Sequence, residues 1–441
     1  MITARAWAGK QYAVYGLARS GLATVAALLA SGARVTAWDD RLRPGAGRGP
    51  GGRGAAGAAA LDPGLPRGTE IADLNETDLS QFDSLVVTPG LPLNTHPIAA
   101  RARAAGVEII GDIELFARAR PELPPHKVVG ITGTNGKSTT TALVHHILKT
   151  AGVPTTMGGN IGLPILAQDP LPEGGVYVLE LSSFQIDLTQ SLDCDVAVLL
   201  NITPDHLDRY DSFEAYAAAK NRLLLMQSNE HKSVINWPAF MAGLINPETA
   251  GFNGISAVTA EDQARWPGLP GPHNAENAGA ALEVCDWLGL PRQEIEHGLR
   301  TYRGLPHRME RIRERNGVLF VNDSKATNAE AAAPALAAYP RVRWIVGGQA
   351  KTNDLGDTAH HLAHVAAAYT IGEDGPMFAQ LLRAAGVPVV ESETLENAVK
   401  RAAGDSQPGE TVLLSPAAAS FDQFRDFEAR GDAFRAAVEG L

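Results

Sequence analysis

The sequence has little of what marks secreted, membrane or nucleic-acid-binding proteins. Its two cysteines, Cys194 and Cys285, cannot form a disulfide framework, and we expect both to be buried thiols. No window approaches the roughly 20 apolar residues of a membrane span, and the opening MITARAWAGKQYAVYG has no signal-peptide core. No Lys/Arg-rich run occurs, and the net charge is -11. We therefore expect a cytoplasmic protein that neither enters membranes nor binds nucleic acid.

Length and hydrophobic patterning predict an α/β protein of several domains. At roughly 150 residues per domain, a chain of 441 residues corresponds to about three. Apolar runs of strand length alternate with helical patterns along the whole chain, which is typical of parallel α/β architecture. We expect domains over residues 1–111, 112–304 and 305–441.

The predicted strands are short apolar runs that end in glycine or polar residues. In the first domain they are QYAVYG, ARVTAWD, SLVVTPG and VEIIG, with a helix over about 20–31. In the second they are KVVGIT, VYVLELS, CDVAVLLNIT and HKSVINW, with helices over about 137–150 and 205–226. In the third they are GVLFVNDS, RVRWIVGG, AAYTIG, VPVVES and ETVLLSP. Runs that are apolar throughout predict strands covered on both faces. The Gly/Ala/Arg-rich tract 43–60 predicts a flexible surface loop.

The segment GITGTNGKSTTT at 130–141 predicts a phosphate-binding loop between a strand and a helix. Backbone N–H groups of such a turn, and the helix N-terminus after it, favour anions. Lys137 would reach the β- and γ-phosphates, and Ser138 would offer its hydroxyl to Mg²⁺. The usual spacing would place a glycine at Ile131, whereas this chain has glycines at 130, 133 and 136. The loop indicates a nucleoside triphosphate and no particular reaction.

Two further residues stand where a nucleotide-bound metal would be held. Glu180 ends the run VYVLELSS, and His206 follows the next strand in NITPDHLDRY. An acid at a strand end beside a phosphate loop is the usual arrangement for Mg²⁺, whereas histidine is an unusual ligand for it. The alternative for His206 is an orienting hydrogen bond, and the alternative for Glu180 is a helix cap or an ion pair. Lys220 lies in the helical run AYAAAKNRLLL. Taken alone, it is expected to be a solvated lysine on a helix surface.

Nine motifs occur in one order along nearly the whole chain: TGTNGKST, ELSSFQ, NITPDHLDRY, AAAKNR, GPHNAENAGAAL, HRME, NDSKATN, GGQAKTNDL and SPAAASFDQFRDFEARG. Together they resemble the Mur ligases of peptidoglycan synthesis. NDSKATN and SPAAASFDQF narrow the resemblance to the branch of that family that adds D-glutamate. The D-N-P-R signature of the branch that adds diaminopimelate does not occur in the sequence.

The resemblance implies three α/β domains, namely a Rossmann-like UDP-binding domain, a central P-loop ATPase-type domain and a C-terminal Rossmann-like domain. We also expect a monomer, although no motif bears on the oligomeric state. Ala18 replaces a glycine of the dinucleotide pattern GxGxxG, which weakens an NAD-binding reading. The positions that match the UDP-substrate site of the family are Arg19, Ser20, Asp39, Arg41, Thr88, Gly90, Asn160 and His206.

The resemblance further implies ATP, two Mg²⁺ ions and D-glutamate as ligands. The ATP positions are Gly133, Thr134, Asn135, Gly136, Lys137, Ser138, Thr139, Asn274, Asn277, Arg308, Asp323 and Lys325. The D-glutamate positions are Thr327, Lys351, Ser420 and Phe427. The metal ligands are Ser138, Glu180, His206 and Lys220, the last as a carbamate, and the catalytic residues are Lys137, His206, Lys220 and Arg308.

The implied reaction joins D-glutamate to UDP-N-acetylmuramoyl-L-alanine through an acyl phosphate. A different Mur ligase or a folylpolyglutamate synthetase is the nearest alternative, and the UDP-type first domain and NDSKATN oppose the latter. An NAD-dependent oxidoreductase is opposed by Ala18 and the central phosphate loop. A non-catalytic nucleotide switch would leave Lys220, Asp323 and Lys351 without a shared purpose.

Overall fold

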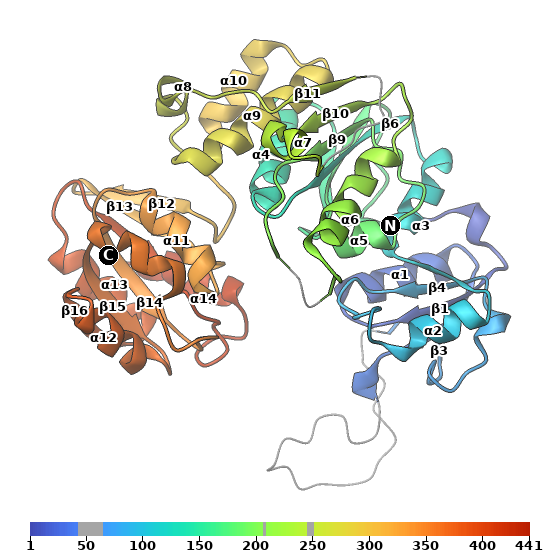
Figure 1. The fold of residues 1–441 in the computed structure, drawn as a ribbon, viewed down its shortest axis with the longest axis horizontal. Coiled ribbons are helices and arrows are strands. Elements are labelled where there is room, and N and C mark those ends of the chain that lie inside the picture. The colour runs from blue at the N-terminus through green and yellow to red at the C-terminus, as the bar shows by residue number, and fades with distance from the viewer. Residues whose placement is uncertain (43–64, 206–208, 245–250) are drawn as a thin grey trace, which may run out of the picture. The chain divides into compact units, whose positions relative to one another are not determined.

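The computed structural model describes residues 1–42, 65–205, 209–244 and 251–441 and contains three β-sheets (Figure 1). The tract 43–60 and His206 lie outside the described residues. The chain divides into two compact units, Met1–Ala257 with Glu276–Gly298, and Val258–Ala275 with Leu299–Leu441. Unit 1 holds the first two sheets and unit 2 holds the third. The α/β class is confirmed, whereas the boundaries near 111 and 304 stay predictions.

The first sheet is parallel throughout and has the strand order β3-β2-β1-β4-β5. The order reverses between β1 and β4, which creates a crevice beyond their carboxyl ends. All four predicted strands form; the two-residue β3 was not predicted. The strands and helices are β1 Gln11–Tyr15, α1 Arg19–Ala30, β2 Arg34–Trp38, β3 Glu70–Ile71, β4 Ser84–Val87, α2 Pro97–Ala104, β5 Glu108–Ile110 and α3 Asp112–Ala119.

The second sheet is also parallel, in the order β11-β10-β9-β6-β8-β7. Here the reversal lies between β6 and β9. Its elements are β6 His126–Thr132, α4 Lys137–Thr150, β7 Thr155–Gly159, β8 Gly175–Glu180, α5 Ser183–Asp187, β9 Val196–Leu199, α6 Phe213–Leu225, β10 Lys232–Ile235, α7 Trp237–Met241 and β11 Phe252–Gly254, and α9 Pro272–Trp287 and α10 Arg292–Thr301 follow.

The predicted helix over 205–226 begins later than expected, at Phe213. Ser212 is its N-cap, with extended backbone and an Oγ that accepts a hydrogen bond from the N–H of Ala215 at 3.2 Å. A serine that caps in this way satisfies an otherwise unpaired helix N–H and stops the helix from extending backwards. Residues 209–211 therefore lie outside the helix.

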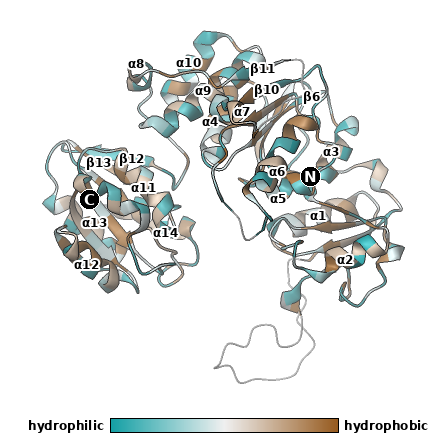
Figure 2. Ribbon diagram, in the orientation of Figure 1, coloured by the Kyte–Doolittle hydropathy of each residue, from teal (hydrophilic) through white to brown (hydrophobic). Residues whose placement is uncertain are grey.

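Hydrophobic residues concentrate in the strands (Figure 2). Every residue of β8 and β9 is buried, as expected for strands covered on both faces. Cys194 and Cys285 are buried free thiols, which confirms that prediction. Among the described residues, no helix combines the length and the apolar character needed to cross a bilayer.

The third sheet has the order β12-β13-β17-β14-β15-β16, and β17 returns to lie between β13 and β14. Its strands are parallel except β12, which forms an antiparallel hairpin with β13. The hairpin turns at Asn316 and Gly317, both with positive φ, as a tight primed turn requires. The elements are β12 Glu310–Arg315, β13 Val318–Asn322, α11 Ala329–Ala337, β14 Val342–Gly347, β15 Val365–Ile371, α12 Gly375–Ala384, β16 Val389–Glu393, α13 Leu395–Asp405, β17 Thr411–Leu414 and α14 Phe427–Glu439.

Candidate active site

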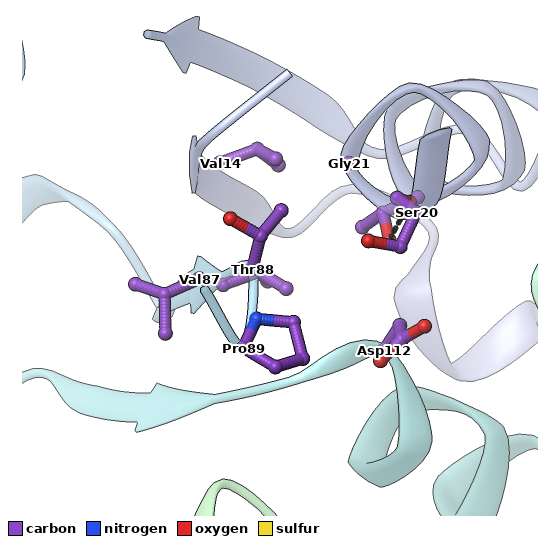
Figure 3. Close-up of a pocket in the computed structure, with 9 residues that line it drawn as sticks. Val14, Ser20, Gly21, Val87, Thr88, Pro89 and Asp112 are labelled. Atoms are coloured by element: carbon purple, nitrogen blue, oxygen red, sulfur yellow. Dashed lines mark hydrogen bonds between the residues drawn. The ribbon is translucent and has the colours of Figure 1, made fainter. Parts of the chain in front are cut away.

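The crevice of the first sheet brings together several predicted UDP-substrate residues. Figure 3 shows Ser20 and Gly21 of α1 on one side, and Thr88 and Pro89, which follow β4, on the other. A Cβ at Gly16 would lie 2.2 Å from Oγ1 of Thr88, so only glycine lets the β1–α1 turn approach Thr88 so closely. The N-cap of α1 is Ala18, which provides no side-chain cap, so the first-turn N–H groups can meet an anion.

Other predicted UDP residues hold the loops around this crevice. Asp39 Oδ2 accepts a hydrogen bond from the N–H of Leu17 at 2.8 Å and so fixes the turn before α1. Arg19 Nη2 donates to the carbonyl of Gly162 at 3.3 Å, which links the first sheet to the loop after β7. Gly90 follows Thr88, and Arg41 lies in a short 3₁₀ turn, Asp40–Leu42.

The phosphate loop forms as predicted between β6 and α4, and the end of β9 holds its shape. The N–H of Thr134 donates to the carbonyl of Asn201 at 2.9 Å, and the N–H of Asn135 donates to Oδ1 of Asn201 at 2.8 Å. Lys137 Nζ donates to the carbonyls of Gly133 and Thr134 at 2.9 and 2.7 Å. The N-cap of α4 is Gly136, without a side-chain cap, which leaves first-turn N–H groups for a phosphate.

The glycine spacing that departed from the usual pattern has a physical explanation. Gly130 lies within β6, where an added Cβ would meet Sγ of Cys194 at 2.6 Å, so it is a packing glycine. Gly136 has φ 83°, and its Cβ would lie 2.3 Å from Oδ1 of Asn277. That same Oδ1 accepts from the hydroxyl of Thr140 at 3.1 Å. The predicted ATP residue Asn277 therefore packs directly against the phosphate loop.

Glu180 lies at the end of β8, and its side chain is 2% exposed. Oε1 accepts a hydrogen bond from Nδ2 of Asn160, a predicted substrate residue, at 2.9 Å. Oε2 is buried with no hydrogen-bond partner among the described residues. A buried carboxylate oxygen left without a donor is costly unless a cation or another donor meets it.

Lys220 is buried in α6, so the reading of a solvated helix lysine is wrong. Its side chain is 1% exposed, Nζ donates to the carbonyl of Gly133 at 2.8 Å, and Nζ lies 4.6 Å from the ring centroid of Tyr216. Burial, reinforced by the charge of Lys137, lowers the pKa of Lys220 to about 7. A substantial part of this amine is therefore neutral and nucleophilic near neutral pH.

In unit 2, Asp323 follows β13 and is 6% exposed. Its oxygens accept from the hydroxyl of Ser415, at the end of β17, at 2.8 Å and from the N–H of Met309 at 3.1 Å. Burial raises the pKa of Asp323 to about 7, against which Arg308 acts weakly. His307 and Met309, on either side of Arg308, both have positive φ. Such strained backbone persists only where its surroundings hold it, and it clusters at functional sites.

The predicted D-glutamate residues come from loops that meet at the carboxyl edge of the third sheet. Gln349, two residues before Lys351, pairs its backbone with Ala419, next to the buried Ser420. Lys325 Nζ lies 3.8 Å from the ring centroid of Phe427, at the start of α14. Thr327 lies in the loop that leads from Asp323 to α11. Asn274 belongs to unit 2, where Nδ2 donates to the carbonyl of Pro270 at 2.8 Å.

Two residues of these sites escaped the sequence reading, although both lie in motifs quoted for the resemblance. Asn201 in NITPDHLDRY fixes the phosphate loop. Arg430 in DFEARG is 1% exposed and joins two of the loops in unit 2. It donates to the hydroxyl and carbonyl of Ser324 at 3.0 and 2.9 Å, and to the carbonyls of Ala418 and Ala419 at 3.0 and 3.2 Å.

Comparison with known proteins gives a consistent picture over the whole chain. Three family models match: a Mur ligase MurD-like N-terminal domain over residues 10–111, a Mur ligase middle domain over 131–242, and a Mur ligase glutamate ligase domain over 307–418. UDP-N-acetylmuramoylalanine–D-glutamate ligases of Novosphingobium aromaticivorans and Sphingopyxis alaskensis are each 57% identical, over 100% of this chain and 97% and 100% of theirs. The crystal structure of UDP-N-acetylmuramate-alanine ligase from Thermotoga maritima has the same fold, with a TM-score of 0.57, 18% identity and coverage of 98% of this chain and 99% of that one.

Proposed function

The chain belongs to the Mur ligase family, and we propose that it catalyses the ATP-dependent addition of D-glutamate to UDP-N-acetylmuramoyl-L-alanine. The names of the relatives at 57% identity support the substrate pair. The structural observation that carries the proposal is the convergence of Lys137 and Lys220 on the carbonyl of Gly133 in the phosphate loop. A buried amine with a lowered pKa beside a phosphate site is a candidate for a chemical role beyond nucleotide binding.

The residues at the end of β8 and the start of α4 fit a divalent metal ion. Glu180 offers a buried carboxylate oxygen without a partner among the described residues, and Ser138 is buried at the start of α4. Oxygen donors of this kind suit Mg²⁺. When bound there, the ion would neutralise charge on the triphosphate. Lys220 would contribute to a second Mg²⁺ site once its neutral amine had added CO2 and released a proton to give a carbamate. His206, the other expected ligand, lies outside the described residues.

The chain's own side chains account for most of the proposed catalysis through charge and positioning. Lys137 and Arg308 would stabilise the phosphoryl group as the substrate carboxylate attacks the γ-phosphate of ATP, which gives an acyl phosphate and ADP. The amine of D-glutamate would then attack the acyl carbon, and phosphate would leave as the amide forms. Asn274, Asn277 and Asp323 would hold the nucleoside of ATP.

D-Glutamate would be recognised by the loops of unit 2. Lys351 is exposed, so its ammonium is available for a substrate carboxylate. Thr327, Ser420 and Phe427 would line the same site, beside which the buried Arg430 donates to the backbone carbonyls of Ala418 and Ala419. The UDP group would occupy the crevice of the first sheet, near Ser20, Asp39 and Thr88.

Phosphate release, measured with each substrate omitted in turn, tests the proposal. We expect release only when ATP, UDP-N-acetylmuramoyl-L-alanine and D-glutamate are all present, with a stoichiometric amide product detected by mass spectrometry. Equal phosphate release when L-alanine replaces D-glutamate, or when a folate replaces UDP-N-acetylmuramoyl-L-alanine, would assign the chain to another ligase. ATP hydrolysis without any amide product would contradict the proposal.

A further inference from the structure

Arg209 makes two contacts that link the first and second sheets of unit 1. It lies between β9 and α6, and its Nη2 donates to the carbonyl of Leu91, in the loop after β4, at 2.9 Å. Its guanidinium carbon lies 4.2 Å from the ring centroid of Phe184 on α5. The Phe184 ring stacks on Tyr210, with centroids 6.0 Å apart and planes 13° apart. The guanidinium therefore makes a cation–π contact with an aromatic ring beside the second sheet, and it also donates a hydrogen bond to a loop of the first sheet.

The same residues wall a cavity of about 550 Å³. Leu91 and Leu93 contribute from the loop after β4, and Val107 and Ile109 from the start of β5. Phe184 contributes from α5, and Arg209 and Tyr210 from the loop before α6. The loop after β4 begins with Thr88 and Gly90, the predicted substrate residues. Arg209 therefore links the loop that holds these predicted substrate residues to the part of unit 1 that carries Glu180 on β8 and Lys220 on α6.

A second arginine makes the reciprocal link, since Arg19 of the first sheet donates to Gly162 of the second. Under the proposed function, the acyl substrate has its UDP group on the first sheet and its reacting carboxylate near Lys220 on the second. A ligand that spans both sheets binds well only if the two are held at the right separation. We propose that Arg209 is a positioning residue for this spanning substrate, because it holds the loop after β4 against the Phe184 ring; the inference rests on the proposed function.

The test compares two ligands that differ only in how far they reach. UDP contacts the first sheet alone, whereas UDP-N-acetylmuramoyl-L-alanine spans both. In calorimetric titrations without ATP, we expect Arg209→Gln to weaken binding of the full substrate about tenfold, as expected for loss of a hydrogen bond to a charged group, and to change UDP binding less than about twofold. In steady-state assays, KM for the full substrate should rise while kcat and KM for ATP stay nearly unchanged.

Arg222→Gln is the matched control. Arg222 also donates to backbone carbonyls, those of Asp187 at the end of α5 and Thr189 just after it. Its hydrogen bonds within the described residues therefore stay beside the second sheet and do not reach the first. We expect Arg222→Gln to bind both ligands like the wild type. Arg209→Lys keeps a cation near the Phe184 ring but replaces the guanidinium by an ammonium. It should bind the full substrate more tightly than Arg209→Gln and less tightly than the wild type. Phe184→Leu should weaken full-substrate binding, and the double variant with Arg209→Gln should show less than the sum of the two effects.

Three outcomes would overturn the inference: wild-type affinity for the full substrate in Arg209→Gln, an equal loss for UDP and the full substrate, or additive effects of the Arg209 and Phe184 variants. If Arg209→Gln does not fold, Arg209→Lys and Phe184→Leu provide the same comparison. Failure of the proposed function is distinguishable, because it would appear in the wild type as no binding of the full substrate or no amide product.

Discussion

Two buried cations, Lys220 in unit 1 and Arg430 in unit 2, occupy comparable depths and are held in different ways. Both side chains are 1% exposed. Lys220 Nζ donates to the carbonyl of Gly133, beside the second cation Lys137, and its pKa falls to about 7. Arg430 donates to Ser324, Ala418 and Ala419, and burial lowers its pKa only to about 10.

The difference separates a reactive group from a structural one. A guanidinium that saturates several backbone acceptors remains charged and fixes the loops that provide those acceptors. A lysine amine near another cation loses its proton readily and becomes available for chemistry. Burial alone therefore does not mark a functional residue, whereas burial with a pKa close to neutral makes a residue a candidate for one.

The largest expected effect comes from removing the reactive cation. Lys220→Ala should reduce turnover by about 10³-fold or more, roughly 4 kcal/mol of transition-state stabilisation, because neither the amine nor its carbamate would remain. Stopped phosphate-release assays at saturating substrates measure it. Lys149→Ala, which alters an exposed lysine in the last turn of α4, is the control and should turn over normally. Full activity in Lys220→Ala would remove any catalytic role for this residue.

Removing the structural cation should reduce stability more than chemistry. Arg430→Met should lower the free energy of unfolding by about 3 kcal/mol, because the hydroxyl of Ser324 and three backbone carbonyls lose their buried donor. Denaturant unfolding followed by fluorescence measures this loss. The exposed Arg425→Met should change stability by less than about 0.5 kcal/mol. Equal stability of the two variants would show that the hydrogen bonds of Arg430 do not stabilise the loops of unit 2.

Two glycines test how the loop that accepts from Lys220 keeps its shape. Gly136 and Gly152 both have positive φ, 83° and 77°, but a Cβ at Gly152 meets nothing within 4 Å, whereas one at Gly136 clashes with Asn277. Substitution by alanine strains both backbones by about 1 kcal/mol. Only Gly136→Ala should also raise KM for ATP, by about tenfold, roughly 1.4 kcal/mol. An equal KM in the two variants would mean that the Asn277 contact does not shape the loop.

The last comparison concerns the buried acid of unit 2. The pKa of Asp323 is raised from 3.8 to about 7 in the folded protein, so the folded state holds this proton more tightly than the unfolded state. Stability from this group is full below pH 4 and is lost as the pH rises to about 7. The side chain in Asp323→Asn does not titrate. When the pH is raised from 5 to 8, the melting temperature of this variant should therefore fall less than that of the wild type, by a few degrees. Parallel melting curves across this range would contradict the raised pKa.

Much of the fold and part of the site could be predicted from local pattern. The phosphate loop and α4 form over the predicted residues, because a buried strand, a glycine turn and a helix start are all encoded within about 20 residues. The hairpin at Asn316-Gly317 was equally local, since Asn-Gly is a strong turn signal, yet it was missed. The late start of α6 at Phe213 depends on the Ser212 cap, which a helical pattern alone did not reveal.

Side-chain environment depended on neighbours that are distant in sequence. The burial of Lys220 requires β9 beside β6, which brings α6 against the loop at Gly133, 87 residues away. Arg430 reaches Ser324 across 106 residues. No periodicity within α6 or α14 distinguishes such a residue from a solvated one. Only the motif resemblance pointed to Lys220, and Arg430 lay within a quoted motif without being singled out.

By itself the sequence determined an α/β protein with a triphosphate loop and the order of its family motifs, because strand, turn and helix preferences act over short distances. The tertiary structure decided which of its many charged side chains lose water, and therefore which pKa values move. Desolvation depends on every element packed around a group, and that packing exists only once sheets with reversed strand order have brought distant loops to one edge.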